Sequence, residues 1–180
     1  SCKPEQTVRL IVQGKDLDDS LRLASSDSSV QWKVEKVDPT QATVALTFEK
    51  EVPLGPFSFW LTTSTGAIKS HTIFLDDLDA VRDNADNHSI ETAQQVSTRS
   101  TVEGVCDAAS SDFYRLDVAA GERIAFEVHT QQLRSPMDPV IRVLNAAGET
   151  LILADDGATS PDCRFSYEFQ QEGDYWIEVQ

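Results

Sequence analysis

The sequence has few of the residues that build disulfide scaffolds and metal centres. Among 180 residues there are three cysteines, three histidines and one methionine. Cys2, Cys106 and Cys163 are too few for a disulfide framework and too scattered for a zinc site. A Cys106–Cys163 bridge requires an oxidising compartment, and two buried thiols are the alternative.

Long apolar runs are also missing. No stretch approaches the roughly 20 apolar residues that span a bilayer, so we expect no membrane insertion. No long apolar stripe repeats every 3.6 residues, as an amphipathic helix requires. The hydrophobic fraction of 40% and the charged fraction of 25% are nevertheless those of an ordinary folded protein.

Positive charge is scarce. The chain has 15 Lys and Arg against 30 Asp and Glu, which gives a formal net charge of −15. Such a surface repels a phosphate backbone, so nucleic acid is not expected as a partner.

Local catalytic motifs are absent. The sequence has no Gly-x-Ser-x-Gly, His-Glu-x-x-His, phosphate-cradling Gly loop or Cys-x-x-Cys. His71, His88 and His129 lie in three different segments. Because a triad can also form from distant residues, this absence favours a protein that is not an enzyme without excluding one.

What the sequence does have is alternation of apolar and polar residues. Tyr114, Leu116 and Val118 alternate with polar residues, and similar patterns fill 138–157 and 164–179. Period-two alternation between Gly, Asp and Asn turns predicts half-buried antiparallel strands, and several in succession predict a sandwich.

The first 76 residues show the same pattern, with Val30, Trp32 and Val34 as one example. We therefore expect an all-β protein of two β-sandwich domains, the first Ig-like, with Trp32 and Trp60 in its core. Composition changes at Asp76, where DDLDAVRDNADNHS is rich in Asp and Asn. The predicted domains are 1–77 and 91–180, with 78–90 as an Asp/Asn-rich linker.

The second half resembles the bacterial pre-peptidase C-terminal (PPC) domain over roughly residues 85–180. The resemblance rests on ADNHSIETAQQV, VEGVC, SDFYRLDVAAGERIAFEV, LRSPMDPVIRVLNAAGETLILADD and EGDYWIEV, in that order. It implies a small jelly-roll-like sandwich attached to secreted peptidases or large surface proteins. It also implies one further strand after Gln180, so that 91–180 would be truncated.

The first half resembles the Ig-like IPT/TIG-type modules that precede such domains. TVRLIVQGKDLDD matches their opening strand, and VPLGPFSFWLTTSTG matches a later strand pair. Any small β-sandwich shares part of this pattern, so this second match is the looser one.

Calcium is the best chemical hypothesis for the Asp/Asn-rich segment, because Ca²⁺ prefers carboxylate, amide and carbonyl oxygens. Asp83, Asp86, Asn87 and Asp112 are the candidate ligands. Collagen-binding relatives chelate calcium in the corresponding places, but the usual Glu is replaced near Ala85. A solvated loop without metal, and hence no cofactor at all, is the competing prediction.

Phe113 and Trp176 are out of phase with the core residues of their strands. They should therefore face outward, where collagen-binding relatives carry an aromatic strip. We predict these two residues as candidate ligand contacts.

Together these observations predict non-catalytic spacer, adhesion or targeting modules of a larger exported bacterial protein. The expected location is the periplasm, the cell surface or the medium. The expected partners are other domains of the same polypeptide and an extracellular protein or polysaccharide. A calcium-dependent binding module and the C-terminal part of a secreted peptidase, with its catalytic domain outside this chain, are the alternatives.

Overall fold

The computed structural model describes residues 2–25, 27–64, 66–106, 110–157 and 162–180, with the backbone only at 67–69. As predicted, the fold is all-β. The described ranges contain no α-helix and one short 3₁₀ helix, η1 (Gln131–Leu133). No helix in them is long and apolar enough to cross a membrane. The chain divides into two compact units, Ser1–Asp77 and Leu78–Gln180.

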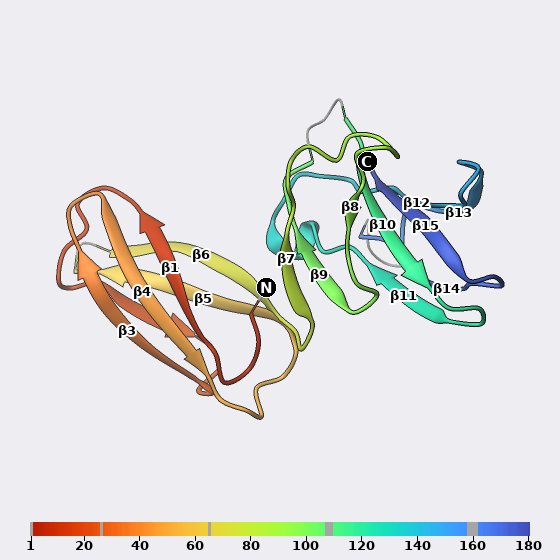
Figure 1. Cartoon of the computed structure of the whole chain (residues 1–180). Coiled ribbons are helices and arrows are strands. Elements are labelled where there is room, and N and C mark those ends of the chain that lie inside the picture. The colour runs from red at the N-terminus through yellow and green to blue at the C-terminus, as the bar shows by residue number, and fades with distance from the viewer. Residues whose placement is uncertain (1, 26, 65, 107–109, 158–161) are drawn as a thin grey trace. The chain divides into compact units, whose positions relative to one another are not determined.

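Unit 1 is a sandwich of two three-stranded sheets with the orders β1-β4-β3 and β2-β5-β6 (Figure 1). All of its strand pairs are antiparallel. The strands are β1 (Thr7–Gln13), β2 (Arg22–Ser25), β3 (Val30–Val37), β4 (Gln41–Phe48), β5 (Gly55–Thr63) and β6 (Gly66–Leu75).

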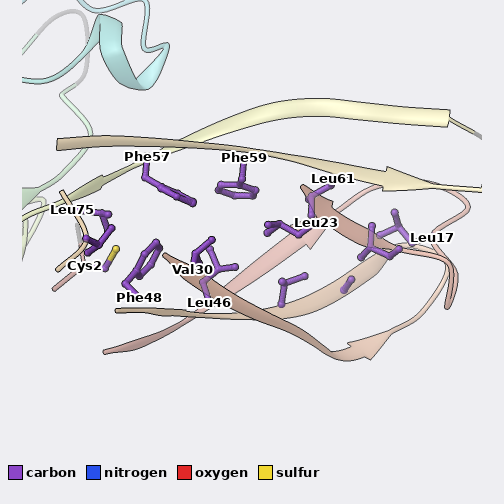
Figure 2. Packing of buried hydrophobic residues seen from close by; sticks show 14 residues of the cluster. Cys2, Leu17, Leu23, Val30, Leu46, Phe48, Phe57, Phe59, Leu61 and Leu75 are labelled. Atoms are coloured by element: carbon purple, nitrogen blue, oxygen red, sulfur yellow. The ribbon is translucent and has the colours of Figure 1, made fainter. Parts of the chain in front are cut away.

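The core of unit 1 lies between β4 of one sheet and β5 of the other (Figure 2). Alternate residues of each strand point inward, so Phe48 meets Phe57 with ring centroids 5.1 Å apart and ring planes at 84°. Phe59 and Leu61 continue the row along β5 and are at most 2% exposed. Each such side chain contributes roughly 1.5–3 kcal/mol by burial.

The two tryptophans predicted in this core lie outside it. Trp60 falls between Phe59 and Leu61 and therefore points to the outer face of β5, where it is 40% exposed. Trp32 is opposite Leu46 in the register and so has the inward phase. It nevertheless remains 36% exposed because β3 is an edge strand.

Unit 2 contains a five-stranded sheet, β13-β12-β15-β10-β8, and two strand pairs, β11-β14 and β7-β9. The bounds are β7 (Asp79–Arg82), β8 (Gln94–Gln95), β9 (Ser100–Glu103), β10 (Asp112–Val118), β11 (Arg123–Glu127), β12 (Ile141–Leu144), β13 (Thr150–Ala154), β14 (Arg164–Glu168) and β15 (Gly173–Val179). Its core has Tyr114, Leu116, Val118, Ile177 and Phe169 among its buried members.

Two turns of unit 2 connect different sheets: residues 119–122 join β10 to β11, and residues 169–172 join β14 to β15. β10 pairs with β15 and β11 pairs with β14, so neither turn closes a hairpin. Gly121 N–H donates to Phe169 O at 2.7 Å, and Phe169 N–H donates to Glu122 O at 2.8 Å. Gly173 has φ +137°, which side-chain-bearing residues rarely adopt. The segments β10–β11 and β14–β15 therefore both pass from the five-stranded sheet to the β11-β14 pair, or back, at adjacent turns.

The segment predicted as a linker, 78–90, begins with structure of its own. Asp79–Arg82 forms β7, which pairs in parallel with β9. Asn87 is fully buried. Asn84 accepts a turn hydrogen bond from Asp86 N–H, and Asn87 bonds to β10, contacts that composition alone does not distinguish from a solvated linker. Cys106 and Cys163 are thiols, so the predicted alternative of a bridge between them is not formed.

Candidate functional site

The candidate site of unit 2 starts where β7 ends, at Asp83. Asp83 N–H donates to Glu103 O at 2.9 Å. Gly104 fits closely beside it, because a Cβ at Gly104 would lie 2.7 Å from the Asp83 Cβ. The hydroxyl of Tyr114 on β10 donates to Asp83 Oδ1 at 3.2 Å. Burial raises the pKa of Tyr114, which keeps its phenol protonated as a donor.

Asn87 ties this loop to β10. Its Nδ2 donates to Phe113 O at 3.2 Å, and Phe113 N–H donates to Asn87 O at 2.7 Å. The side chain is 0% exposed. Its Oδ1 has no hydrogen-bond partner in the described part of the chain. A buried amide oxygen without a partner is costly, and such groups often mark a ligand or a bound water.

Asp112, the first residue of β10, is 3% exposed and contacts the His88 side chain. Its Oδ1 lies 3.1 Å from His88 Nδ1, and the nearby Cys106 thiol donates to the backbone carbonyls of Ser110 at 3.5 Å and Val179 at 3.7 Å. Burial, followed by the nearby charge of Asp83, raises the pKa of Asp112 against the opposing effects of His88 and Cys106. The His88 side chain itself is 50% exposed.

Three of the four predicted calcium ligands belong to this one neighbourhood. All three, Asp83, Asn87 and Asp112, affect the pKa of the Tyr114 phenol: Asn87 and Asp83 by side-chain hydrogen bonds, and Asp83 and Asp112 by their negative charge. Asp86 is exposed in the preceding turn, where its N–H donates to Asn84 Oδ1 at 3.0 Å. Within the described ranges, no three Asp, Glu, His or Cys side chains come together as a metal ion requires.

Phe113 and Trp176 share the outward face of the large sheet, as their phase predicts. Phe113 is opposite Glu178, and Trp176 is opposite Arg115 in the next outward-facing row. Between them Glu178 is 4% exposed and its carboxylate lies 2.7 Å from an Arg142 nitrogen, so this part of the face is covered.

The cover over Trp176 comes from the same loop that carries Asn87. The Trp176 indole Nε1–H donates to Ile90 O at 3.1 Å. Ile90 also reaches the β12–β13 turn, because a Cβ at Gly148 would lie 3.7 Å from Ile90 Cδ1. Trp176 therefore anchors residues 88–92 to β15, a structural contact that the sequence-based prediction of a ligand residue did not include.

A second candidate site, which we call the β3 hollow, was missed by sequence reasoning. It measures about 600 Å³ and is lined by Asp19, Arg22 and β3 residues Trp32, Lys33, Val34, Glu35, Lys36 and Val37. β2 has four residues and β3 has eight, so the facing edge strand is too short to cover β3. A strand-length mismatch is the only signal in the sequence, and it becomes visible once the two strands are known to be neighbours.

Comparisons with known proteins give distant structural similarities only. The sequence matches no protein-family model, and no curated protein matches it. SGBP-B of the Bacteroides ovatus mixed-linkage glucan utilization locus, solved with a mixed-linkage heptasaccharide, is 8% identical with a TM-score of 0.34; the match covers 99% of this chain and 73% of that one.

Two further solved structures match still more weakly. The secreted serine protease VesC from Vibrio cholerae is 6% identical with a TM-score of 0.29, over 98% of this chain and 43% of that one. Lac15 from a marine microbial metagenome is 12% identical with a TM-score of 0.25, over 99% and 50%. At these TM-scores no function is transferred to this chain.

Proposed function

We propose that the chain is a pair of non-catalytic modules, an Ig-like sandwich followed by a PPC-type sandwich, from a larger exported bacterial protein. They act as spacer or adhesion and targeting units, at the cell surface, in the periplasm or in the medium. The ordered series of motifs along 85–180 supports the PPC-type assignment. The separate apolar core of each unit supports a modular role.

The arrangement around Asp112 is the observation that carries the non-catalytic part of this proposal. In nucleophilic catalysis the base lies between the nucleophile and the orienting acid. Here the carboxylate of Asp112 contacts His88, whereas the Cys106 thiol donates to the backbone carbonyls of Ser110 and Val179. A neighbouring carboxylate opposes formation of the thiolate, which is the nucleophilic form of cysteine. An acid–imidazole pair beside a thiol that donates to the backbone suits a structural network.

A turnover assay tests this proposal directly. The full chain is incubated with casein and with a panel of polysaccharides, and products are followed by mass spectrometry. We expect no product beyond that of a heat-denatured sample. Turnover that disappears in His88→Ala or Cys106→Ala, and persists in His129→Ala, would place a catalytic centre at Asp112 and contradict the proposal.

A calcium-dependent binding module is the second candidate function, and the buried Oδ1 of Asn87 is the observation that favours it. The carboxylates of Asp83 and Asp112 lie in the same neighbourhood and carry the negative charge that Ca²⁺ requires. These three side chains provide only part of the six to eight oxygens of a typical site, so backbone carbonyls and water would supply the others.

Calorimetric melting with Ca²⁺ and with EDTA tests this second candidate. At a Ca²⁺ concentration about 100-fold above Kd, binding stabilises the native state by about 2.7 kcal/mol, which raises Tm by several degrees. The rise should disappear in Asp83→Asn and persist in Asp117→Asn, a change at an exposed residue of β10. An equal Tm in Ca²⁺ and EDTA would remove this function from consideration.

A further inference from the structure

We propose that the β3 hollow binds an anionic saccharide, a sugar ring that carries a carboxylate or a sulfate. This inference names a ligand for the proposed non-catalytic role and rests on that role. The ring of Trp32 would form the floor for the sugar, and the cations around it would attract the acidic group.

Trp32 supplies the aromatic surface of the hollow. It has the inward phase of β3, opposite Leu46, yet 36% of its surface is exposed because β2 does not extend over it. Val34 and Val37 line the same hollow and are half-buried. An indole ring with a negative face attracts the C–H groups of a sugar, which carry partial positive charge.

Cations are scarce in this chain, but three of them line the hollow. Only 15 basic residues accompany 30 acidic ones, yet Arg22, Lys33 and Lys36 all line this hollow. Of the two acids in the lining, Glu35 is held by Arg9, whose Nε and Nη2 donate to its two carboxylate oxygens at 2.9 and 3.2 Å. A local excess of cations on an acidic protein favours binding of an anion at that place.

The shape of the edge favours a sugar over a peptide strand. A peptide would add to β3 by main-chain pairing along its free edge. The register of β3 is interrupted between Val34 and Lys36, and Lys33 and Lys36 lie beside this interruption. Bulges and lysines are the devices that protect edge strands from pairing. A ring that lies on Trp32 needs no continuous strand register.

The orientation of Arg22 fits this arrangement. Its Nη1 donates to Asp19 O at 2.9 Å and to Leu21 O at 2.8 Å, which fixes the guanidinium at the rim of the hollow. A guanidinium has five N–H donors in a rigid fork, so others remain for a carboxylate or sulfate. A cation that is already held in place loses less entropy when the ligand binds.

Titration calorimetry on the full chain tests the proposal. The probes are a galacturonic acid oligosaccharide, a sulfated oligosaccharide, a neutral cello-oligosaccharide and an oligoglutamate peptide. We expect at least one of the two charged saccharides to bind, with an affinity that falls between about 50 and 500 mM NaCl. The carboxylated and sulfated probes distinguish the two sources of negative charge.

Variants locate the site. Trp32→Ala should weaken binding by about tenfold or more, because it removes the ring face. Trp60→Ala is the matched control, because Trp60 is 40% exposed on the outer face of β5. The Trp60→Ala variant should bind the saccharide with the affinity of the parent protein. The double change Lys33→Gln and Lys36→Gln should weaken binding and reduce its salt dependence. Because both lysines are exposed, the double variant should fold normally. It therefore tests the location of the binding site even if Trp32→Ala fails to fold.

Several outcomes would overturn the inference. They are equal binding of the neutral saccharide, loss of binding in Trp60→Ala, Trp32-dependent binding of oligoglutamate in place of the saccharides, or no binding by any probe. Absence of binding leaves the non-catalytic proposal intact, whereas binding followed by cleavage of the saccharide would keep the site and contradict the non-catalytic proposal.

Discussion

At the scale of single residues, Asp162 shows how a buried carboxylate organises unit 2. It is 6% exposed, and its Oδ1 accepts hydrogen bonds from Thr130 N–H at 2.9 Å, from Gln131 N–H at 3.0 Å and from the Thr130 hydroxyl. Burial alone would raise the pKa of Asp162, but the hydrogen bonds outweigh it and hold the pKa below its ordinary value. The ionised form is therefore the one that stabilises the fold.

We predict that Asp162→Ala lowers the free energy of unfolding at pH 7 by about 1–3 kcal/mol, because it leaves buried donors without an acceptor. A group with a lowered folded pKa contributes fully above its unfolded pKa of about 3.9 and loses its contribution as pH falls through the folded value. Urea unfolding of parent and variant should thus converge in acid. Asp117→Ala, at an exposed position, should change little. A gap that stays constant from neutral pH to about pH 2 would contradict this account.

Sequence reasoning could not find Asp162, because its partner Thr130 is 32 residues away and the contact depends on the path of the intervening chain. The loop around Asp83 was easier to locate, since Asp and Asn cluster there. What composition could not supply was the role of each residue. Asn87 is buried against Phe113, whereas Asp86, its neighbour, is exposed.

At the scale of elements, β15 holds the loop that leads into β8. The Trp176 indole is bonded to Ile90 O, and the side chain is half-buried beneath that loop. Alternation predicted its outward direction correctly, but outward did not mean exposed to solvent. The loop covers that part of the face, so Trp176 has a structural partner already.

We predict that Trp176→Phe destabilises unit 2 by about 0.5–1.5 kcal/mol, because the aromatic ring remains and the indole N–H is lost. Hydrogen exchange should also become faster at residues 88–92, which that bond anchors. Trp60→Phe, outside this contact, serves as the control in the same urea titration. If Trp176→Phe unfolds with the midpoint of the parent and unchanged exchange, the anchoring role is wrong.

Strand positions were predictable at this scale, whereas strand partners were not. The alternation of Tyr114, Leu116 and Val118 places β10 correctly. It does not show that the turn at 119–122 leads into another sheet, because a hairpin and a corner have the same local periodicity. The exposure of Trp32 has a similar origin: its phase was predicted, and the shortness of the facing strand β2 was not.

At the scale of the whole molecule, the two units have separate cores. The cluster around Phe48 and Phe59 contains residues of Ser1–Asp77 only. The cluster around Tyr114 and Phe169 contains residues of Leu78–Gln180 only. Each unit therefore has an apolar cluster formed by its own residues.

Separate expression of 1–77 and 78–180 tests most directly whether the chain consists of two self-sufficient β-sandwich modules. Each half should give a dispersed amide NMR spectrum and a single cooperative urea transition. Dispersion reports fixed tertiary packing, which an unfolded or loosely collapsed half would lack. A half that is unfolded by itself, and folds only in the presence of the other, would contradict the claim.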